Sequence, residues 1–123
     1  MAVHKQVLGK EGEEIAERYL KNKGFKLLER NYRCPVGELD VIALDRKVLV
    51  FVEVRTRTSD GSGSPLESVD RRKQRQIIKT ASYFLSQKRL HDHDARFDVV
   101  GISMGDGEPV VEHIRNAFEV RWS

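Results

Sequence analysis

Residues 37–57 read GELDVIALDRKVLVFVEVRTR, and their alternation of apolar and polar side chains predicts two antiparallel strands joined by a tight turn. A two-residue loop at Arg46 and Lys47 would place Asp45 opposite Val48 and fix all pairs beyond them. A four-residue loop gives the same register, whereas a loop of odd length shifts it by one. The side chains expected on the shared face are Asp40, Ile42 and Leu44 on the first strand and Leu49, Phe51, Glu53 and Arg55 on the second.

This register sets Asp40 opposite Glu53, and Glu38 opposite Arg55. Two carboxylates across a ladder have Cβ atoms roughly 5 Å apart, and like charges at that distance destabilise the pair. A divalent cation would compensate, since Mg²⁺ is commonly held by one or two carboxylates together with waters and substrate phosphates. The hairpin therefore predicts a site for Mg²⁺ or Mn²⁺ at these two acids.

Composition bounds the kind of protein. The 123 residues, 33% of them charged, predict one domain covering residues 1–123. No apolar run approaches the roughly 20 residues that span a bilayer, and the first residues lack the apolar region of a signal peptide, so we expect a cytoplasmic protein with no membrane partner. Cys34 is the only cysteine, which excludes an intrachain disulfide; we expect it partly buried at a strand end. The net charge of +3 mildly favours a polyanionic partner.

Periodicity and turn residues predict the other elements. We expect helices over residues 8–23, ended by Gly24, and over 66–89, and strands over 25–33, 95–103 and 108–115. The order αβββαββ predicts an α/β fold, a mixed sheet flanked by helices, with the second helix linking a parallel pair of strands. Residues 58–65 are expected to form a polar loop and residues 91–94, HDHD, a solvated connection. The residues expected in the core of the two helices are Ile15, Ala16, Tyr19, Leu20, Val69, Ile77, Ile78, Ala81, Phe84 and Leu85.

A possible catalytic group consists of four residues. Glu13 lies on the inward stripe of the first helix, where an acid can also simply complement the helix dipole. Together with Asp40 and Glu53 it could hold a cation that neutralises a phosphodiester and lowers the pKa of an attacking water. Arg55 points to the same face as Glu53, two residues away, and could stabilise the developing charge. The alternative is that Arg55 pairs with Glu38 or Glu53 in a structural ion cluster.

Basic residues gather after the polar loop. A charged helical face is often only solvated, but its position beside the predicted metal site favours contact with nucleic acid. Such contacts follow phosphates and carry no sequence code, which favours recognition of shape, such as a branch or a flap. On the next strand, Arg96 and Asp98 are expected to form a structural pair. The predicted nucleic-acid contacts are Arg57, Arg71, Arg72, Lys73, Arg75 and Lys79.

Several ordered motifs resemble a known family. GKEGEEIAERYL (residues 9–20), NYRCPVGELDVIA (31–43), FVEVRTR (51–57), Lys73 and RFDVV (96–100) resemble the YraN-like family of small bacterial proteins, also called UPF0102. That family is similar to the restriction-endonuclease-like fold of PD-(D/E)xK nucleases and to archaeal Holliday-junction resolvases. The resemblance implies that Glu13, Asp40, Glu53 and the carbonyl of Val54 are metal ligands, and that DNA is the partner. Resolvase likeness also suggests a homodimer, because a four-way junction offers two equivalent cuts.

The sequence departs from the nuclease motif at Arg55, where that motif has lysine. An arginine, with a pKa above about 12, cannot act as a general base, although its planar fork can hold a phosphate. Lys73 could supply a further cation from the neighbouring helix. Two hypotheses remain: a Mg²⁺- or Mn²⁺-dependent, structure-selective endonuclease acting on DNA, or a non-catalytic nucleic-acid-binding or adaptor module. The residues do not decide between DNA and RNA.

Overall fold

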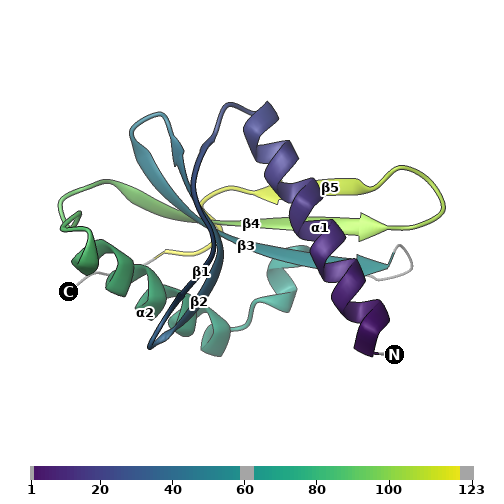
Figure 1. The fold of residues 1–123 in the computed structure, drawn as a ribbon, viewed down its shortest axis with the longest axis horizontal. Helices are drawn as coiled ribbons and strands as arrows, with labels where there is room; N and C mark the ends of the chain where they lie inside the picture. Colours follow the sequence, from purple (N-terminus) through teal and green to yellow (C-terminus); the bar gives the residue numbers. More distant parts are fainter. Residues whose placement is uncertain (1, 59–62, 120–123) are drawn as a thin grey trace.

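The computed structural model describes residues 2–58 and 63–119, with side chains from residue 8 onward. Its elements follow the chain as α1 (Ala2–Asn22), β1 (Lys26–Cys34), β2 (Gly37–Asp45), β3 (Val48–Thr58), the 3₁₀ helix η1 (Pro65–Ser68), α2 (Arg71–Gln87), β4 (Ala95–Met104) and β5 (Val110–Ile114). The five strands form one mixed sheet in the spatial order β1-β2-β3-β4-β5, and α1 crosses β3, β4 and β5 diagonally (Figure 1). The predicted α/β class and the order αβββαββ are confirmed.

β2 and β3 form the predicted hairpin, with a two-residue turn at residues 46–47. Arg46 has a φ of 60°, the left-handed conformation that two-residue turns demand, although neither turn residue is glycine. The ladder starts with Asp45 opposite Val48 and keeps its register for five pairs. The register expected from the sequence is confirmed for these pairs.

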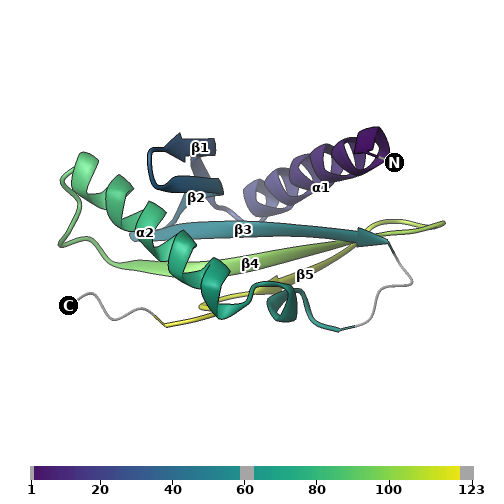
Figure 2. The same cartoon turned by 90° about the horizontal axis from the view of Figure 1, so that it is seen from below.

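The ladder between β2 and β3 ends at Val41 and Val52, earlier than the sequence predicted. Beyond this point β2 stays paired with β1, and the β1–β2 ribbon turns out of the plane of β3, β4 and β5 (Figure 2). Glu38 therefore pairs with Arg33 of β1, with 3.3 Å between Glu38 Oε2 and Arg33 Nε. Its expected position opposite Arg55 is wrong, because the two strands have separated before they reach it.

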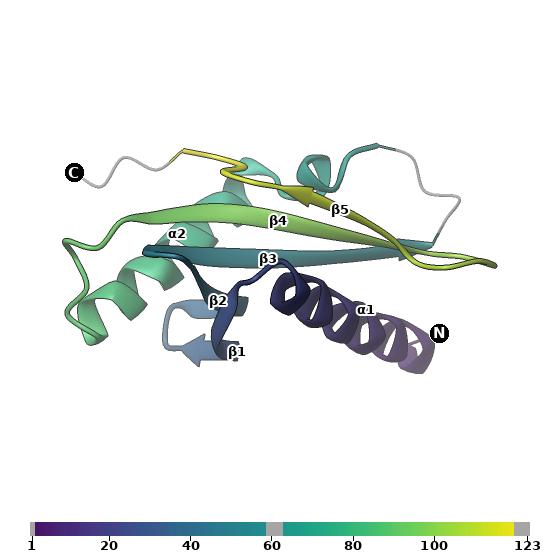
Figure 3. The same ribbon diagram turned by 90° about the horizontal axis from the view of Figure 1, so that it is seen from above.

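β3 and β4 run parallel through ten pairs, and α2 lies in the connection between them, as predicted. Each face of the sheet has its own core. Figure 3 shows α1 and the β1–β2 ribbon on one side of β3, with η1 on the other. On the α1 face, Ala16 and Leu20 pack with Val50, Val52, Val100 and Ile102; on the α2 face, Ile77, Ala81 and Phe84 pack with Phe51, Phe97 and Val99.

Gly12 brings α1 into close contact with β3. The residue is buried, and a Cβ at this position would overlap the side chain of Thr56. Because a glycine inside a helix costs about 1 kcal/mol relative to alanine, its presence here is explained by this close approach. At the other end, Gly24 has a φ of 93° and ends α1 as predicted, with Phe25 N donating to Leu20 O at 3.0 Å.

α2 begins at Arg71, five residues later than the sequence predicted. Asp70 is extended and caps the helix, since its side chain accepts a hydrogen bond from Lys73 N at 2.8 Å. Residues 65–68 form η1 instead, and Val69 is buried between the two elements without belonging to α2. The apolar pattern alone could not show this break, because Val69 faces the same core as the helix.

The other expectations concern connections and ends. Cys34 closes β1 and is partly buried, and residues 91–94 connect α2 to β4 with mostly exposed side chains. Residues 59–62 of the polar loop and the tail at Trp122 lie outside the described residues. None of the described helices combines the length and apolarity needed to cross a membrane. The cytoplasmic location stays a prediction.

Gly12→Ala should destabilise the protein, whereas Gly9→Ala should stabilise it. Both glycines lie in α1, and alanine favours the helix by about 1 kcal/mol at either position. A Cβ at Gly9 has no atom within 4 Å, whereas at Gly12 it meets Thr56. We expect a loss of roughly 1–3 kcal/mol in the free energy of unfolding for Gly12→Ala, measured by urea denaturation. Equal effects of the two substitutions would contradict the close contact of α1 with β3.

Candidate active site

Asp40 lies just past the last pair of the β2–β3 ladder. Its carboxylate replaces the main-chain acceptor that β2 would provide if the ladder continued. Oδ2 accepts a hydrogen bond from the N–H of Val54 at 2.8 Å. A backbone donor of β3 that would otherwise lack an acceptor from β2 is thereby satisfied. The same bond fixes the Asp40 carboxylate over the middle of β3, next to Glu53.

Glu53 is a nearly buried acid, with 8% of its side chain exposed. Its carboxyl group lies close enough to Asp40 for a hydrogen bond between the two acids. The structure therefore brings together the two carboxylates that the hairpin register placed opposite each other. They meet through their side chains, beyond the last recorded pair of the ladder.

Two cations contact Glu53. Arg55 Nη2 lies 3.3 Å from Glu53 Oε2, and Lys73 Nζ, arriving from α2, lies 3.6 Å from the same oxygen. Arg55 Nε is buried and has no hydrogen-bond acceptor among the described residues. A buried donor without a partner costs about 1–3 kcal/mol, and such groups call for a ligand or another functional explanation.

The titration of Glu53 reflects this surrounding. Burial and, after it, the charge of Asp40 raise its pKa to about 7, although Lys73 and Arg55 act in the opposite direction. Near neutral pH Glu53 is therefore only partly ionised. A bound cation would favour the ionised form of Glu53.

Glu13 lies near this pair without joining it. Burial raises its pKa, and Asp40 is the next contributor, so the α1 acid is within electrostatic reach of β2. Glu13 lines a cavity of about 370 Å³ with Val54, Arg55 and Thr56 of β3. The contact of Gly12 with Thr56 sets this position, because Glu13 follows Gly12 directly in the helix.

The predicted nucleic-acid contacts divide into three kinds. Lys73 points to Glu53, whereas Arg71, Arg72, Arg75 and Lys79 have exposed side chains on α2. Arg57 is held within the protein: its Nη1 donates to Gly63 O at 2.6 Å and its Nε to Ser103 Oγ at 3.2 Å. The first turn of α2 holds basic residues and no acid, which opposes the helix dipole.

Comparison with known proteins gives the family. Residues 12–102 match the model described as "Uncharacterised protein family UPF0102". The chain belongs to the UPF0102 family. A UPF0102 protein of Geobacter metallireducens is 48% identical over 99% of this chain and 100% of the relative. A second, from Geotalea uraniireducens, is 50% identical over 94% of this chain and 91% of the relative.

A structural comparison adds a distant similarity. The structure of Pyrococcus furiosus SfsA in complex with Ca²⁺ aligns with 94% of this UPF0102 chain and 65% of that chain. The sequence identity is 14% and the TM-score is 0.37. A similarity at this level carries no conclusion about fold, ligand or activity.

The donor set of this UPF0102 protein fits a hard divalent cation. Asp40 and Glu53 offer adjacent carboxylate oxygens, and a bound cation would favour the ionised form of Glu53, whose pKa is raised. Among the described residues, however, no three His, Cys, Asp or Glu side chains are grouped as metal ligands. The arrangement is thus a pair of acids, which suits Mg²⁺ or Mn²⁺ with remaining positions for water and phosphate. Ligation by Glu13 and by the Val54 carbonyl stays a prediction.

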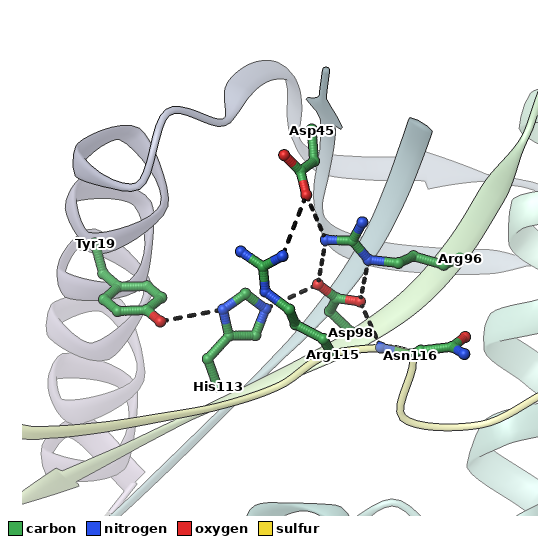
Figure 4. Close-up of polar contacts among 7 residues, drawn as sticks. All are labelled: Tyr19, Asp45, Arg96, Asp98, His113, Arg115 and Asn116. Carbon is green, nitrogen blue, oxygen red and sulfur yellow. Dashed lines mark hydrogen bonds and ion pairs between the residues drawn. The ribbon is translucent and has the colours of Figure 1, made fainter. Parts of the chain in front are cut away.

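The sequence reasoning missed a polar network that joins side chains of α1, β2, β4 and β5 (Figure 4). It confirms the expected pair of Arg96 and Asp98, with 3.0 Å between Nε and Oδ1, but extends well beyond it. Burial alone would raise the pKa of the fully buried Asp98, yet hydrogen bonds from His113, Arg96 and a backbone N–H hold it below its usual value. His113 Nδ1 in turn contacts the Tyr19 hydroxyl at 3.1 Å. A charged pair inside an apolar strand was the one available signal.

Glu53→Gln should remove a loss of stability that the wild type shows above neutral pH. A pKa raised from 4.5 to about 7 favours the folded state below pH 4.5, and this advantage disappears as pH rises through 7. In urea denaturation with a chelator, we expect the wild type to lose roughly 2–3 kcal/mol relative to Glu53→Gln between about pH 5 and about pH 8.

The matched control is Glu14→Gln, which removes an exposed acid of α1. Its free energy of unfolding should equal that of the wild type at both pH values. Because each variant is compared with the wild type at the same pH, the pH dependence caused by other groups, such as Asp98, cancels. If the free energy of unfolding of Glu53→Gln instead changes with pH as that of the wild type does, Glu53 is not the buried acid described above.

Proposed function

We propose that the protein is a metal-dependent endonuclease that hydrolyses phosphodiester bonds in DNA. The observation that carries this proposal is the meeting of Asp40 and Glu53 beside Arg55 and Lys73. The two acids could hold a divalent cation, and the two basic side chains lie next to them. A phosphate bound here would contact the metal ion on one side and the basic side chains on the other. A restriction-endonuclease-like active site, as the sequence resemblance implies, is supported by this grouping.

Each residue has a distinct role in the proposal. Asp40 and Glu53 would hold Mg²⁺ or Mn²⁺, which when bound neutralises phosphate charge and makes water a better nucleophile. The hydrogen bond from Val54 N fixes Asp40, so the acid is in place before any ligand arrives. Glu13 lines the adjoining cavity and adds negative charge on the α1 side.

Arg55 and Lys73 are the groups that would contact the phosphate. Arg55 cannot accept a proton at physiological pH, so its role is to donate hydrogen bonds to phosphate oxygens and stabilise developing charge. Its free, buried Nε shows that the guanidinium is not saturated by Glu53. Lys73 already reaches the same carboxylate from α2, so it can serve as a second cation at the edge of the site.

The exposed basic residues of α2 support binding of nucleic acid. Arg71, Arg75 and Lys79 recur every four residues and so follow one stripe of the helix. Basic residues in the first turn of a helix weaken it slightly, which favours a role outside stability. Contacts of this kind read phosphates and shape, and we therefore propose branched or junction DNA as the substrate.

A second function is favoured by one observation. Arg55 stands where the nuclease motif has lysine and is engaged with Glu53, as in a structural ion cluster. On this alternative, the protein is a non-catalytic nucleic-acid-binding or adaptor module. Arg71→Ala and Arg75→Ala would then weaken DNA binding and reduce its salt dependence, while changes at Asp40 would affect stability alone.

Asp40→Asn should abolish cleavage without loss of DNA binding. Asparagine keeps an oxygen that can accept from Val54 N but removes the charge, so it tests chemistry with little effect on the fold. We would screen labelled junction, flap and single-stranded DNA with Mg²⁺ and with Mn²⁺. The wild type should cut branched DNA, and Asp40→Asn should be slower by roughly 100-fold or more.

Two further variants and a control sharpen this test. Arg55→Lys should retain cleavage, since it keeps a cation, whereas Lys73→Met should reduce it. Asp106→Asn removes an acid in the exposed turn between β4 and β5 and should behave as the wild type. A wild-type protein that binds these DNAs but never cuts them with either metal would leave the binding module as the function.

Mn²⁺ should bind the wild type at about pH 8 and bind far more weakly at about pH 5. Metal binding requires deprotonated carboxylates, and Glu53 gives up its proton only near pH 7. Titration calorimetry should show heat for the wild type at the higher pH and none for Asp40→Asn, with Asp106→Asn as the matched control. Equal heats for all three proteins would contradict a site at Asp40 and Glu53.

A further inference from the structure

A basic pocket lies at the opposite end of β3 from the carboxylates. It has a volume of about 630 Å³ and is bordered by the hairpin turn, the residue after α1, the start of β4 and the residue after β5. Val48 at this end and Glu53 are five residues apart on β3, which corresponds to roughly 17 Å in a strand. The pocket is therefore separate from the candidate active site. The charged residues lining it are Lys23, Asp45, Arg46, Lys47, Arg96 and Arg115.

The charge of the basic pocket is strongly unbalanced. Its described lining holds five cations and one carboxylate, a surplus of four positive charges, whereas the whole chain has a net charge of +3. These residues come from four places in the sequence, so no single run of basic residues indicates the pocket. Like charges gathered in one hollow repel one another, and an anionic ligand would relieve this repulsion.

Buried groups hold Arg96 in place at the base of the pocket. Its Nε and Nη2 donate to the two oxygens of Asp98 at 3.0 and 3.2 Å (Figure 4). Asp98 is itself fixed by His113 Nε2 at 2.8 Å and by the N–H of Asn116 at 3.0 Å. The side chain of Arg96 is 17% exposed. A guanidinium with this support loses little freedom when it binds a ligand.

Asp45 cannot satisfy the cations around it. Its Oδ2 accepts from Arg96 Nη2 at 2.9 Å and lies 3.5 Å from Arg115 Nη1, so one oxygen is shared between two guanidiniums. Each guanidinium has five N–H donors, and no described residue accepts a hydrogen bond from Arg96 Nη1. Donors therefore remain for a ligand.

Aromatic rings pack against three of the cations. The guanidinium carbons of Arg96 and Arg115 lie 5.7 and 5.6 Å from the ring centre of Phe25. Lys23 Nζ lies 5.7 Å from the ring of Tyr19, which also contacts the His113 side chain. These ring contacts help to hold the cations at the pocket, where several of them can meet a ligand with more than one negative charge.

We propose that the basic pocket binds phosphate groups of a nucleic-acid backbone. Arginine forks match phosphate oxygens, and a single phosphate cannot balance four surplus charges. A nucleic-acid strand brings successive phosphates about 3.4 Å apart along its axis and can engage several of the cations at once. The pocket is thus a second anchoring surface, and it requires neither a metal nor cleavage at the carboxylates.

The test is DNA binding by Lys47→Ala/Arg115→Ala in the presence of a chelator. Lys47 is exposed and the Arg115 side chain is 56% exposed, so the fold should survive, as a thermal melt would verify. Fluorescence anisotropy with a labelled duplex of about 20 base pairs should show roughly tenfold weaker binding. The slope of log affinity against log salt should fall by about two, one for each lost phosphate contact.

The matched control is Arg18→Ala/Lys88→Ala, which also removes two exposed positive charges but none from the pocket. It should change affinity by less than about twofold. Equal losses in both double variants would overturn the proposal, because general charge would then explain binding.

Inorganic pyrophosphate is the second probe. If it shifts the backbone NMR signals of Phe25 and Arg115 while the pocket variant binds DNA normally, the pocket binds a small phosphate ligand. That result would overturn the nucleic-acid assignment. Since the chelator prevents cleavage throughout, an inactive carboxylate site would not affect the result.

Discussion

The hydrogen bond from Val54 N to Asp40 Oδ2 is the contact on which the candidate site depends. β2 and β3 separate after Val41 and Val52, and at this point a side-chain carboxylate replaces a backbone carbonyl as acceptor. That substitution holds Asp40 beside Glu53 despite the repulsion between them. It also ties the geometry of the acids to the bend of the β1–β2 ribbon, because any shift in the point of separation would move Asp40 along β3.

Two cations contact Glu53, but they do not return its pKa to the ordinary value of a glutamate. Arg55 and Lys73 both contact one oxygen of Glu53, yet its pKa remains raised to about 7 by burial and by Asp40. A purely structural ion cluster would be expected to depress the pKa of the acid that it surrounds. Glu53 is instead only partly ionised near neutral pH, and a bound cation would complete its ionisation. This is the electrostatic property that a site for a cation and a phosphate should have.

Sequence alone predicted the elements and their order, because hydrophobic periodicity and turn residues act over short distances. It also predicted the hairpin register, which follows from a two-residue turn, and so the meeting of Asp40 with Glu53.

The sequence-based prediction failed where distant segments decide the structure. Glu38 pairs with β1 because β2 leaves β3, and no local pattern reveals where two strands separate. α2 starts later than predicted because Asp70 caps it. The apolar Val69 just before the cap fits the pattern of the helix and so hides this start in the sequence. The basic pocket joins side chains from four parts of the chain, and Gly12 within a helix was the one signal of a close contact that the sequence reasoning did not use.

The parallel pairing of β3 with β4 also determines how the protein reaches this structure. The hairpin joins residues 13 positions apart at Asp40 and Glu53, so the two acids can approach as soon as the turn closes. Leu49 and Ala95, in contrast, are 46 positions apart, and their pairing requires closure of a long loop that contains α2. Contacts of such separation are slow to form and set the folding rate of a topology like this one. Of the two cations that contact Glu53, Arg55 lies on β3 itself, whereas Lys73 lies in the long connection and reaches the acids only when β3 and β4 are paired.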